Sequence, residues 1–242
     1  MITNNISPRE VTSQFRITEH VFNRFEIDSF SQDKILNNTA LTEINPDFLV
    51  DVLNVFCNYK EVDIDMFSKY SVLTIIDYLE RSHNYYRSKI LPEIGQSISN
   101  LLNNYPEHHA LKNVLHKFYF KYKVDLETHF KEEEEGIFLY AKKLYKAVYF
   151  RKELSFLIEF FRNNSINHFI EEHSDTIAEL YEVICVLSRY KPPETNASSF
   201  RILLEKLHYF EHDLNIHAFI EDRVLICMLL TLEQKLNFEI NN

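Results

Sequence analysis

A histidine and a glutamate four residues apart lie on the same side of an α-helix, and this pair occurs twice, as His129–Glu133 and His217–Glu221. Each pair falls within a run of apolar residues that has the three-then-four spacing of a helix facing a protein core. The runs are Leu111, Leu115, Phe118, Tyr122, Leu126 and Tyr140 around the first pair, and Leu203, Leu207, Phe210, Leu214, Val224 and Met228 around the second. The ionisable residues therefore occupy positions where the pattern demands a hydrophobic side chain.

Two further histidines occupy core positions of this kind. His83 lies in the run Ile76, Leu79, Tyr86 and Ile90, and His173 lies in the run Ile166, Ile170, Ile177, Leu180, Ile184 and Leu187. The spacing from His83 to His129 nearly equals the spacing from His173 to His217. The four runs thus carry His, His-x3-Glu, His and His-x3-Glu in order, which indicates an internal repeat of two helical hairpins.

The scarcity of helix breakers predicts an all-α fold. The chain has only two glycines and six prolines in 242 residues, and strand patterns are almost absent. The predicted main domain covers 71–232, with helices over about 71–102, 107–145, 166–188 and 199–232, and with Pro92 bending the first helix without ending it. A small helical module is predicted over 1–60, with one helix from the Ser7 cap and Pro8 to about Phe25, a turn-like stretch over 28–40 and a second helix from Pro46 to about Phe56.

Charge and cysteine content exclude several classes of protein. The formal charge of −10 argues against DNA, RNA or an anionic membrane as a partner, because phosphate binding needs a basic surface. The three scattered cysteines fit a reducing compartment better than a disulfide framework. Neither a secretory signal nor an apolar run of about 18–20 residues is visible, so we expect a cytoplasmic protein.

The inward polar residues are explained best by a metal centre. A buried carboxylate without compensation is unfavourable by several kcal/mol, and two of them lie on the same stripes as four histidines. Such a ligand set can hold two divalent ions that share the carboxylates, and mixed nitrogen and oxygen donors suit iron or manganese. The predicted ligands are His83, His129, Glu133, His173, His217 and Glu221. This set leaves coordination positions open for dioxygen, nitric oxide or peroxide.

Glu132 competes with Glu133 for the first carboxylate position. After His217 the third residue is Ile220, so only Glu221 can serve in the second hairpin, and the repeat favours Glu133 in the first. Any one such histidine alone is more typical of an ordinary core or boundary residue, whereas six polar residues in register on four helices indicate ligands. The remaining histidines are expected at the surface or around the ligands: His20, His116, His168, His208 and His212, with His108 and His109 near one end of the helices.

Several motifs match a known family. They are Ile76-Asp77-Tyr78 before His83, Leu91-Pro92-Glu93-Ile94 after it, His129-x3-Glu133 followed by Phe138, Glu172-His173, and His217-x3-Glu221. Through these motifs, residues 71–232 resemble the hemerythrin-like domain of the iron–sulfur-cluster repair di-iron proteins (the RIC family). Val21 to Asp28 and Ile44-Asn45-Pro46 resemble parts of that family's small leading domain.

The resemblance implies a four-helix up-down-up-down hemerythrin-like bundle with a small N-terminal helical module. It also implies that the six predicted ligands hold two non-haem iron ions with carboxylate and oxo bridges. The family usually has two adjacent cysteines where this chain has Ser29-Phe30-Ser31, so the resemblance implies a degenerate N-terminal module that lacks the cysteine pair. A histidine common in the family falls on Tyr105, with His108 and His109 nearby, and an insertion is expected around 146–160.

Three functions fit this reading. The first is repair of iron–sulfur clusters damaged by nitric oxide or oxidants, with the protein as iron donor. The second is a carrier or sensor that binds dioxygen or nitric oxide reversibly, and the third is reduction of nitric oxide or peroxide. The expected partners are dioxygen or nitric oxide, iron–sulfur proteins or the cluster-assembly machinery, and a second copy of the chain in a homodimer.

Overall fold

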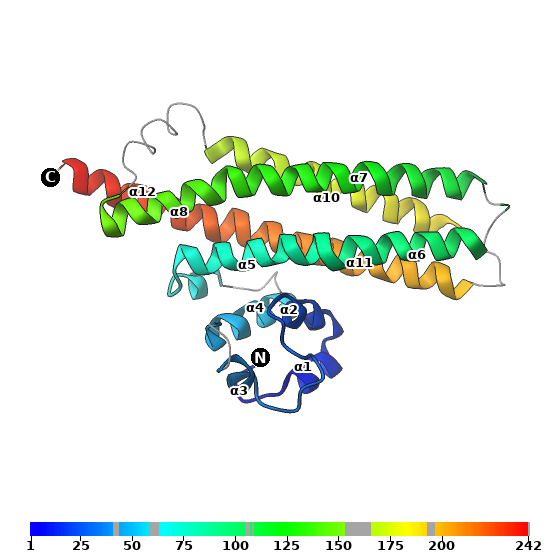
Figure 1. Ribbon diagram of the computed structural model, residues 1–242, viewed down its shortest axis with the longest axis horizontal. Helices are drawn as coiled ribbons and strands as arrows, with labels where there is room; N and C mark the ends of the chain where they lie inside the picture. Colours follow the sequence, from blue (N-terminus) through cyan, green and yellow to red (C-terminus); the bar gives the residue numbers. More distant parts are fainter. Residues whose placement is uncertain are drawn as a thin grey trace. The chain divides into compact units, whose positions relative to one another are not determined.

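The computed structural model describes residues 1–40, 44–58, 63–104, 107, 109–152, 166–192 and 197–241, with the backbone alone at 109–110, 166–175 and 237–241. The described residues form helices and contain no β-strand, so the predicted all-α class is confirmed (Figure 1). None of the described helices is both long enough and apolar enough to cross a membrane.

The N-terminal helices are short. They are α1 (Pro8–Gln14), η1 (Arg16–Thr18), α2 (Glu19–Arg24), α3 (Ile35–Thr39) and α4 (Pro46–Asn58). Ser7 and Glu10 form the predicted start of α1 as a reciprocal capping box, with Pro8 in the first turn.

The prediction of one helix up to Phe25 is wrong, because α1 ends at Gln14 and the next residue, Phe15, has φ −133° and ψ 83°. The hydroxyls of Thr12 and Ser13 donate to backbone carbonyls one turn earlier, and such bonds weaken a helix end. Helix α3 also lies within the stretch predicted as turn-like, whereas α4 begins at Pro46 as predicted.

The first long helix passes through Pro92 as predicted. Helix α5 (Val72–Tyr85) continues into the π-helical segment η4 (Tyr86–Ile90) and then into α6 (Leu91–Asn104). Proline in a helix removes one backbone donor and crowds the preceding turn. The wider π turn directly before Pro92 accommodates this, so the helix changes its winding instead of ending.

The second long helix is interrupted at one residue. Helix α7 (His109–Glu135) is followed by α8 (Ile137–Phe150), and Gly136 between them has φ −98° and ψ −96°. Its N–H still bonds Glu132 and its carbonyl still accepts from Tyr140, so the chain continues in the same direction after a local bend (Figure 1). Helix α8 ends at Phe150, and the next residue, Arg151, has a left-handed backbone with φ 56°. The expected insertion around 146–160 is described only as far as residue 152.

The remaining helices are α10 (Ile166–Arg189), α11 (Ala197–Phe219), the π-helical segment η5 (Ile220–Leu225) and α12 (Ile226–Asn241). Helix α10 matches its predicted range. The fourth predicted helix is confirmed but extends well beyond the expected end near Leu232. A π turn thus interrupts this helix as well, and each of the two π segments starts three residues after a predicted histidine ligand, His83 or His217.

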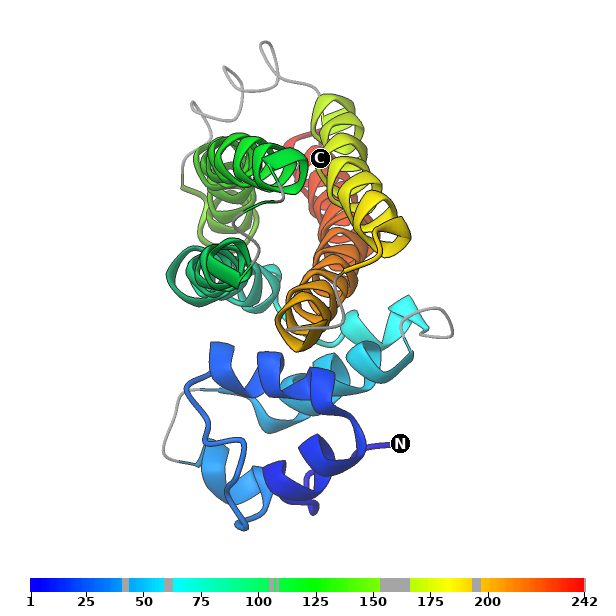
Figure 2. The same cartoon turned by 90° about the vertical axis from the view of Figure 1, so that its right-hand side faces the viewer.

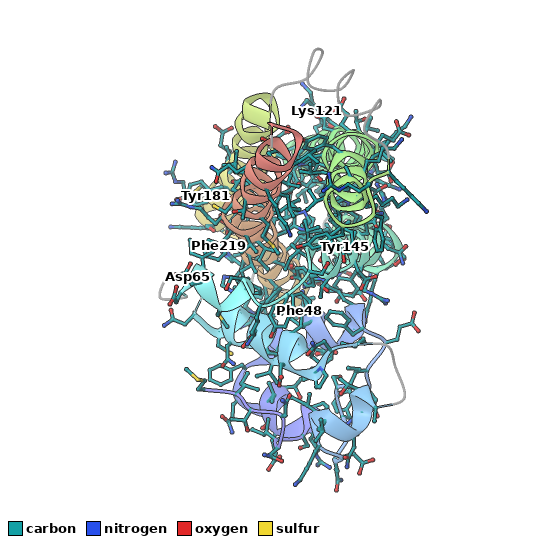
Figure 3. The ribbon with its side chains drawn as sticks, turned by 90° about the vertical axis from the view of Figure 1, so that its left-hand side faces the viewer. Phe48, Asp65, Lys121, Tyr145, Tyr181 and Phe219 are labelled. Carbon is teal, nitrogen blue, oxygen red and sulfur yellow. The ribbon has the colours of Figure 1, made fainter. Side chains whose placement is uncertain are left out.

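The described chain divides into two compact units, one made of 1–85 with 219–242 and the other of 86–218. Within the second unit, α6, α7, α10 and α11 run side by side (Figures 1 and 2). The exposed Lys121 on α7, labelled in Figure 3, pairs with Glu179 of α10 at 2.9 Å. Lys206 of α11 pairs with Glu93 of α6 at 2.7 Å. The predicted boundaries at 1–60 and 71–232 stay a prediction.

One of the two glycines sets how closely two of these helices approach. A Cβ on Gly95 of α6 would collide with the ring and hydroxyl of Tyr119 on α7. The Tyr119 hydroxyl instead crosses this gap and donates to the Leu91 carbonyl at 2.9 Å. A side chain at position 95 would therefore displace the Tyr119 ring and disturb its bond to Leu91.

Candidate metal centre

Helix α7 carries the first His-x3-Glu pair on its inner side. His129 Nε2 and Glu133 Oε1 are 2.8 Å apart, and only 13% and 4% of the two side chains are exposed. Glu132, by contrast, is exposed. The helical register that the sequence favours is therefore the one that buries Glu133, and the two potential ligand atoms of this pair already point to one place.

Three of the predicted ligands form a cluster. One ligand atom from each of His83, Glu133 and His217 lies within 4.8 Å of the other two, and all three residues are buried. His83 belongs to the last turn of α5, Glu133 to α7 and His217 to the last turn of α11. Two imidazole nitrogens and a carboxylate oxygen that converge in this way are a donor set for a divalent metal such as iron or manganese.

A very small cavity lies beside two of the histidines. His129 and His217 line it together with Thr176, and the rest of its wall is apolar, including Phe130 and Leu214. Its volume of about 10 Å³ corresponds to roughly one water-sized probe. A space of this size holds about one water-sized molecule and is too small for a metabolite.

Two aromatic rings contact His217. The ring centroids of Tyr86 and His217 are 5.9 Å apart with the planes at 71°, and those of Phe130 and His217 are 6.3 Å apart at 60°. Tyr86 and Phe130 stack on each other at 5.7 Å and 26°, and Phe210 meets Tyr86 edge-on. The imidazole is thus held by two rings that are themselves packed together.

A buried hydrogen bond next to this ring cluster was missed by the sequence analysis. The Tyr86 hydroxyl donates to Asp213 Oδ1 at 2.6 Å, and both residues are buried. Tyr86 fits a hydrophobic pattern and so gave no signal. Asp213 could have been noticed, because it lies four residues before His217 and extends the series of inward ionisable residues on α11.

Tyr122 of α7 is a second buried tyrosine in this unit. It stacks on Phe118 at 5.0 Å and meets Phe210 edge-on. Burial raises the pKa of Tyr122 well above its ordinary value, and the Glu179 carboxylate adds to the rise. Within the described part of the chain its hydroxyl has no hydrogen-bond partner, so this residue acts as an apolar ring in the core.

The other predicted ligands are placed less completely. Glu221 is buried in η5, four residues after His217, but is not in the cluster found among the described residues. The side chain of His173 lies outside the described residues, as do Tyr105, His108 and the side chains of His109 and His168. His116 and His208 are exposed, and His20 and His212 are half-buried.

The cysteines do not replace the pair missing at Ser29–Ser31. All three are free; Cys57 and Cys185 are half-buried and Cys227 is exposed. Burial raises the pKa of the Cys57 thiol to about 11, so it carries little thiolate near neutral pH. The described residues around Ser29–Ser31 contain no cysteine.

A curated relative covers nearly the whole chain. The protein is 20% identical over 228 residues to the iron-sulfur cluster repair protein ScdA of Staphylococcus haemolyticus (strain JCSC1435), which spans 93% of this chain and 98% of the relative. No family model and no solved structure matches the chain. The similarity is distant, but its length supports the resemblance to iron–sulfur-cluster repair proteins.

Proposed function

We propose that this protein is a non-haem di-iron protein that helps to repair iron–sulfur clusters damaged by nitric oxide or oxidants, and that it does so as an iron donor. The observation that carries the proposal is the convergence of His83, Glu133 and His217, with His129 bonded to Glu133. The similarity to a protein named for iron–sulfur cluster repair supports the choice among the functions that such a site allows.

The proposed architecture is a four-helix up-down-up-down hemerythrin-like bundle over 71–232, preceded by a small helical module over 1–60. In this proposal the helices α5–α6, α7, α10 and α11–α12 supply the six ligands His83, His129, Glu133, His173, His217 and Glu221. The donor set fits iron, because it combines imidazole nitrogens with carboxylate oxygens and contains no thiolate. When bound, two iron ions supply redox chemistry and open positions for a diatomic ligand.

The protein side chains define what reaches the site. The cavity beside His129 and His217 admits only a very small molecule, and its wall is mostly apolar. Dioxygen and nitric oxide are small and uncharged, so they fit this space, whereas a cluster or a metabolite does not. In our proposal a damaged cluster is therefore repaired by iron that leaves the protein and not by entry of the cluster into the helices.

The carboxylates determine how readily iron leaves. Glu133 Oε1 lies 2.8 Å from His129 Nε2, so each of these two proposed ligands offers the other a partner that competes with a metal ion. A site with two shared carboxylates and two imidazoles for each ion is also poorer in nitrogen donors than one with five histidines. We therefore expect ferrous iron to be released under mild conditions.

Iron transfer separates the donor from the carrier or sensor. The reduced, iron-loaded protein is mixed with a ferrous chelator or an apo cluster-assembly system, and iron transfer is followed by absorbance. We expect transfer within minutes, and nitric oxide binding to the reduced centre without rapid turnover. A protein that retains its iron against a strong chelator for hours while it binds dioxygen reversibly would be a carrier or sensor instead.

A further inference from the structure

Tyr86 and Asp213 form a buried polar pair at a position where an apolar contact would suffice. The Tyr86 hydroxyl donates to Asp213 Oδ1 at 2.6 Å, and the relative exposure of each residue is 0%. A buried carboxylate is unfavourable unless hydrogen bonds compensate for its lost hydration. Phenylalanine and leucine at these two positions would avoid this penalty, so the pair calls for an explanation beyond core packing.

The pair lies one helical turn from two candidate ligands. Tyr86 is the first residue of η4 and follows His83 by three residues, and Asp213 precedes His217 by four residues on α11. Residues three or four apart share a helix face. Both members of the pair therefore lie on the faces that carry candidate ligands.

The ring of Tyr86 transmits this bond to His217. It meets the imidazole of His217 edge-on at 5.9 Å and stacks on Phe130, which contacts the same imidazole from a second direction. The hydroxyl bond to Asp213 restricts both the rotation and the tilt of the Tyr86 ring. The His217 imidazole packs at a steep angle against both of these stacked rings, so a fixed Tyr86 ring limits the planes that the imidazole can adopt.

We propose that Tyr86 and Asp213 are positioning residues that fix the orientation of the His217 imidazole. Metal affinity depends on the ring orientation of a histidine ligand, which proteins usually fix through a hydrogen bond to the ring. Here a tyrosine held by an aspartate fixes the ring through aromatic contact. The binding of a metal by His217 rests on the proposed function. The orientation of its ring by Tyr86 and Asp213 is independent of that function.

The matched variants are Tyr86→Phe and Tyr122→Phe. Each removes one hydroxyl from a buried ring that contacts Phe210, but only Tyr86 is hydrogen-bonded to Asp213 and touches His217. Metal-free protein labelled with ¹³C and ¹⁵N at histidine is compared by NMR, with His217 assigned from a His217→Gln variant. We expect Tyr86→Phe to shift and broaden the His217 ring signals, and Tyr122→Phe to leave them in place.

The second readout uses cobalt(II) as the metal probe. Cobalt titration of Tyr86→Phe should show the wild-type stoichiometry, a changed ligand-field spectrum and an affinity lowered by about tenfold. Asp213→Asn retains an acceptor for the Tyr86 hydroxyl and should rescue most of the affinity, whereas Asp213→Leu should match Tyr86→Phe.

The two readouts distinguish failure of this inference from failure of the proposed function. If Tyr86→Phe leaves both the His217 signals and the cobalt affinity at wild-type values, the positioning role is wrong. If the wild-type protein binds no metal but Tyr86→Phe still shifts the His217 signals, the positioning role holds and the proposed metal centre is wrong.

Discussion

Two regions of the molecule bury charged or ionisable side chains, and they do so in opposite ways. Arg24 of α2 is 4% exposed, and its guanidinium lies 5.2–5.6 Å from the ring centres of Phe56, Tyr78 and Tyr85. In the other region the cluster of His83, Glu133 and His217 brings electron-pair donors together at one place.

The difference concerns which partner each charge needs. Aromatic faces attract a cation, so the ring cage around Arg24 stabilises the charge that is already there. Converging imidazole nitrogens and carboxylate oxygens are a donor set for a metal cation. The first arrangement is made of groups of the chain alone, whereas our proposal adds a bound metal to the second.

The largest effect is expected from removing a donor of the cluster. Glu133→Ala should lose most of its bound iron, because the buried carboxylate is shared between the ions in our proposal. Glu132→Ala is the matched control, since this residue is adjacent but exposed. Elemental analysis of both variants after identical expression measures the effect. If Glu132→Ala empties the site and Glu133→Ala does not, the assignment of the ligand on α7 is wrong.

Removing the metal should lower stability. Ligand binding to the native state stabilises it by about 4 kcal/mol when free metal is a thousandfold above its dissociation constant. The apo form should therefore melt at a lower temperature than the iron-loaded form by calorimetry. Histidine ligands must be neutral, so the difference should shrink as pH falls and the iron is released. Equal melting temperatures at neutral pH would mean that the donors do not hold a metal within the fold.

The aromatic cage around Arg24 should contribute stability without metal. Arg24→Met keeps an apolar stem but removes the desolvated cation, and we expect a loss of about 2 kcal/mol in the free energy of unfolding. Arg81→Met is the control: Arg81 lies 5.8 Å from the Phe25 ring, but its side chain is 39% exposed, so its loss should stay below about 1 kcal/mol. Urea unfolding of metal-free protein measures both. Equal losses of unfolding free energy in the two variants would contradict the claim that an enclosed cation contributes more stability than an exposed one.

The smallest change in stability is expected at the exposed carboxylate of Glu10, which is hydrogen-bonded to Ser7 three residues earlier. Hydrogen bonds from the Ser7 backbone N–H and hydroxyl lower the pKa of Glu10. These bonds to the ionised carboxylate therefore stabilise α1 when the pH is above the ordinary carboxyl pKa, and they are lost as the pH falls and Glu10 is protonated. Ser7→Ala should cost about 1 kcal/mol near neutral pH and less in acid, by urea unfolding at several pH values. A loss that grows as pH falls would contradict the capping role.

The sequence predicted the helices wherever apolar periodicity is long and uninterrupted. It predicted α10 and the passage of the first helix through Pro92, because a single residue cannot outweigh the burial of a long apolar face. It did not predict the break at Phe15, the bend at Gly136 or the two π segments. These depend on one residue or one turn, and a pattern averaged over several turns cannot resolve them.

For the candidate site, periodicity indicated which residues face inward but not which side chains meet. The inward register of His129 and Glu133 follows from the stripe on α7. The hydrogen bond between Tyr86 and Asp213 joins residues far apart in sequence, and nothing in the sequence indicates that these two side chains meet. Such pairs are set by the packing of helices against one another, which no local pattern encodes.

The central claim is tested most directly by the metal content of the protein as purified. The full chain is expressed in iron-replete cells, and iron, manganese and zinc per chain are measured by elemental analysis together with the absorption spectrum. Our account predicts two iron ions per chain and absorption bands of an oxo-bridged ferric pair. A protein with no metal, or with one zinc ion per chain, would contradict it.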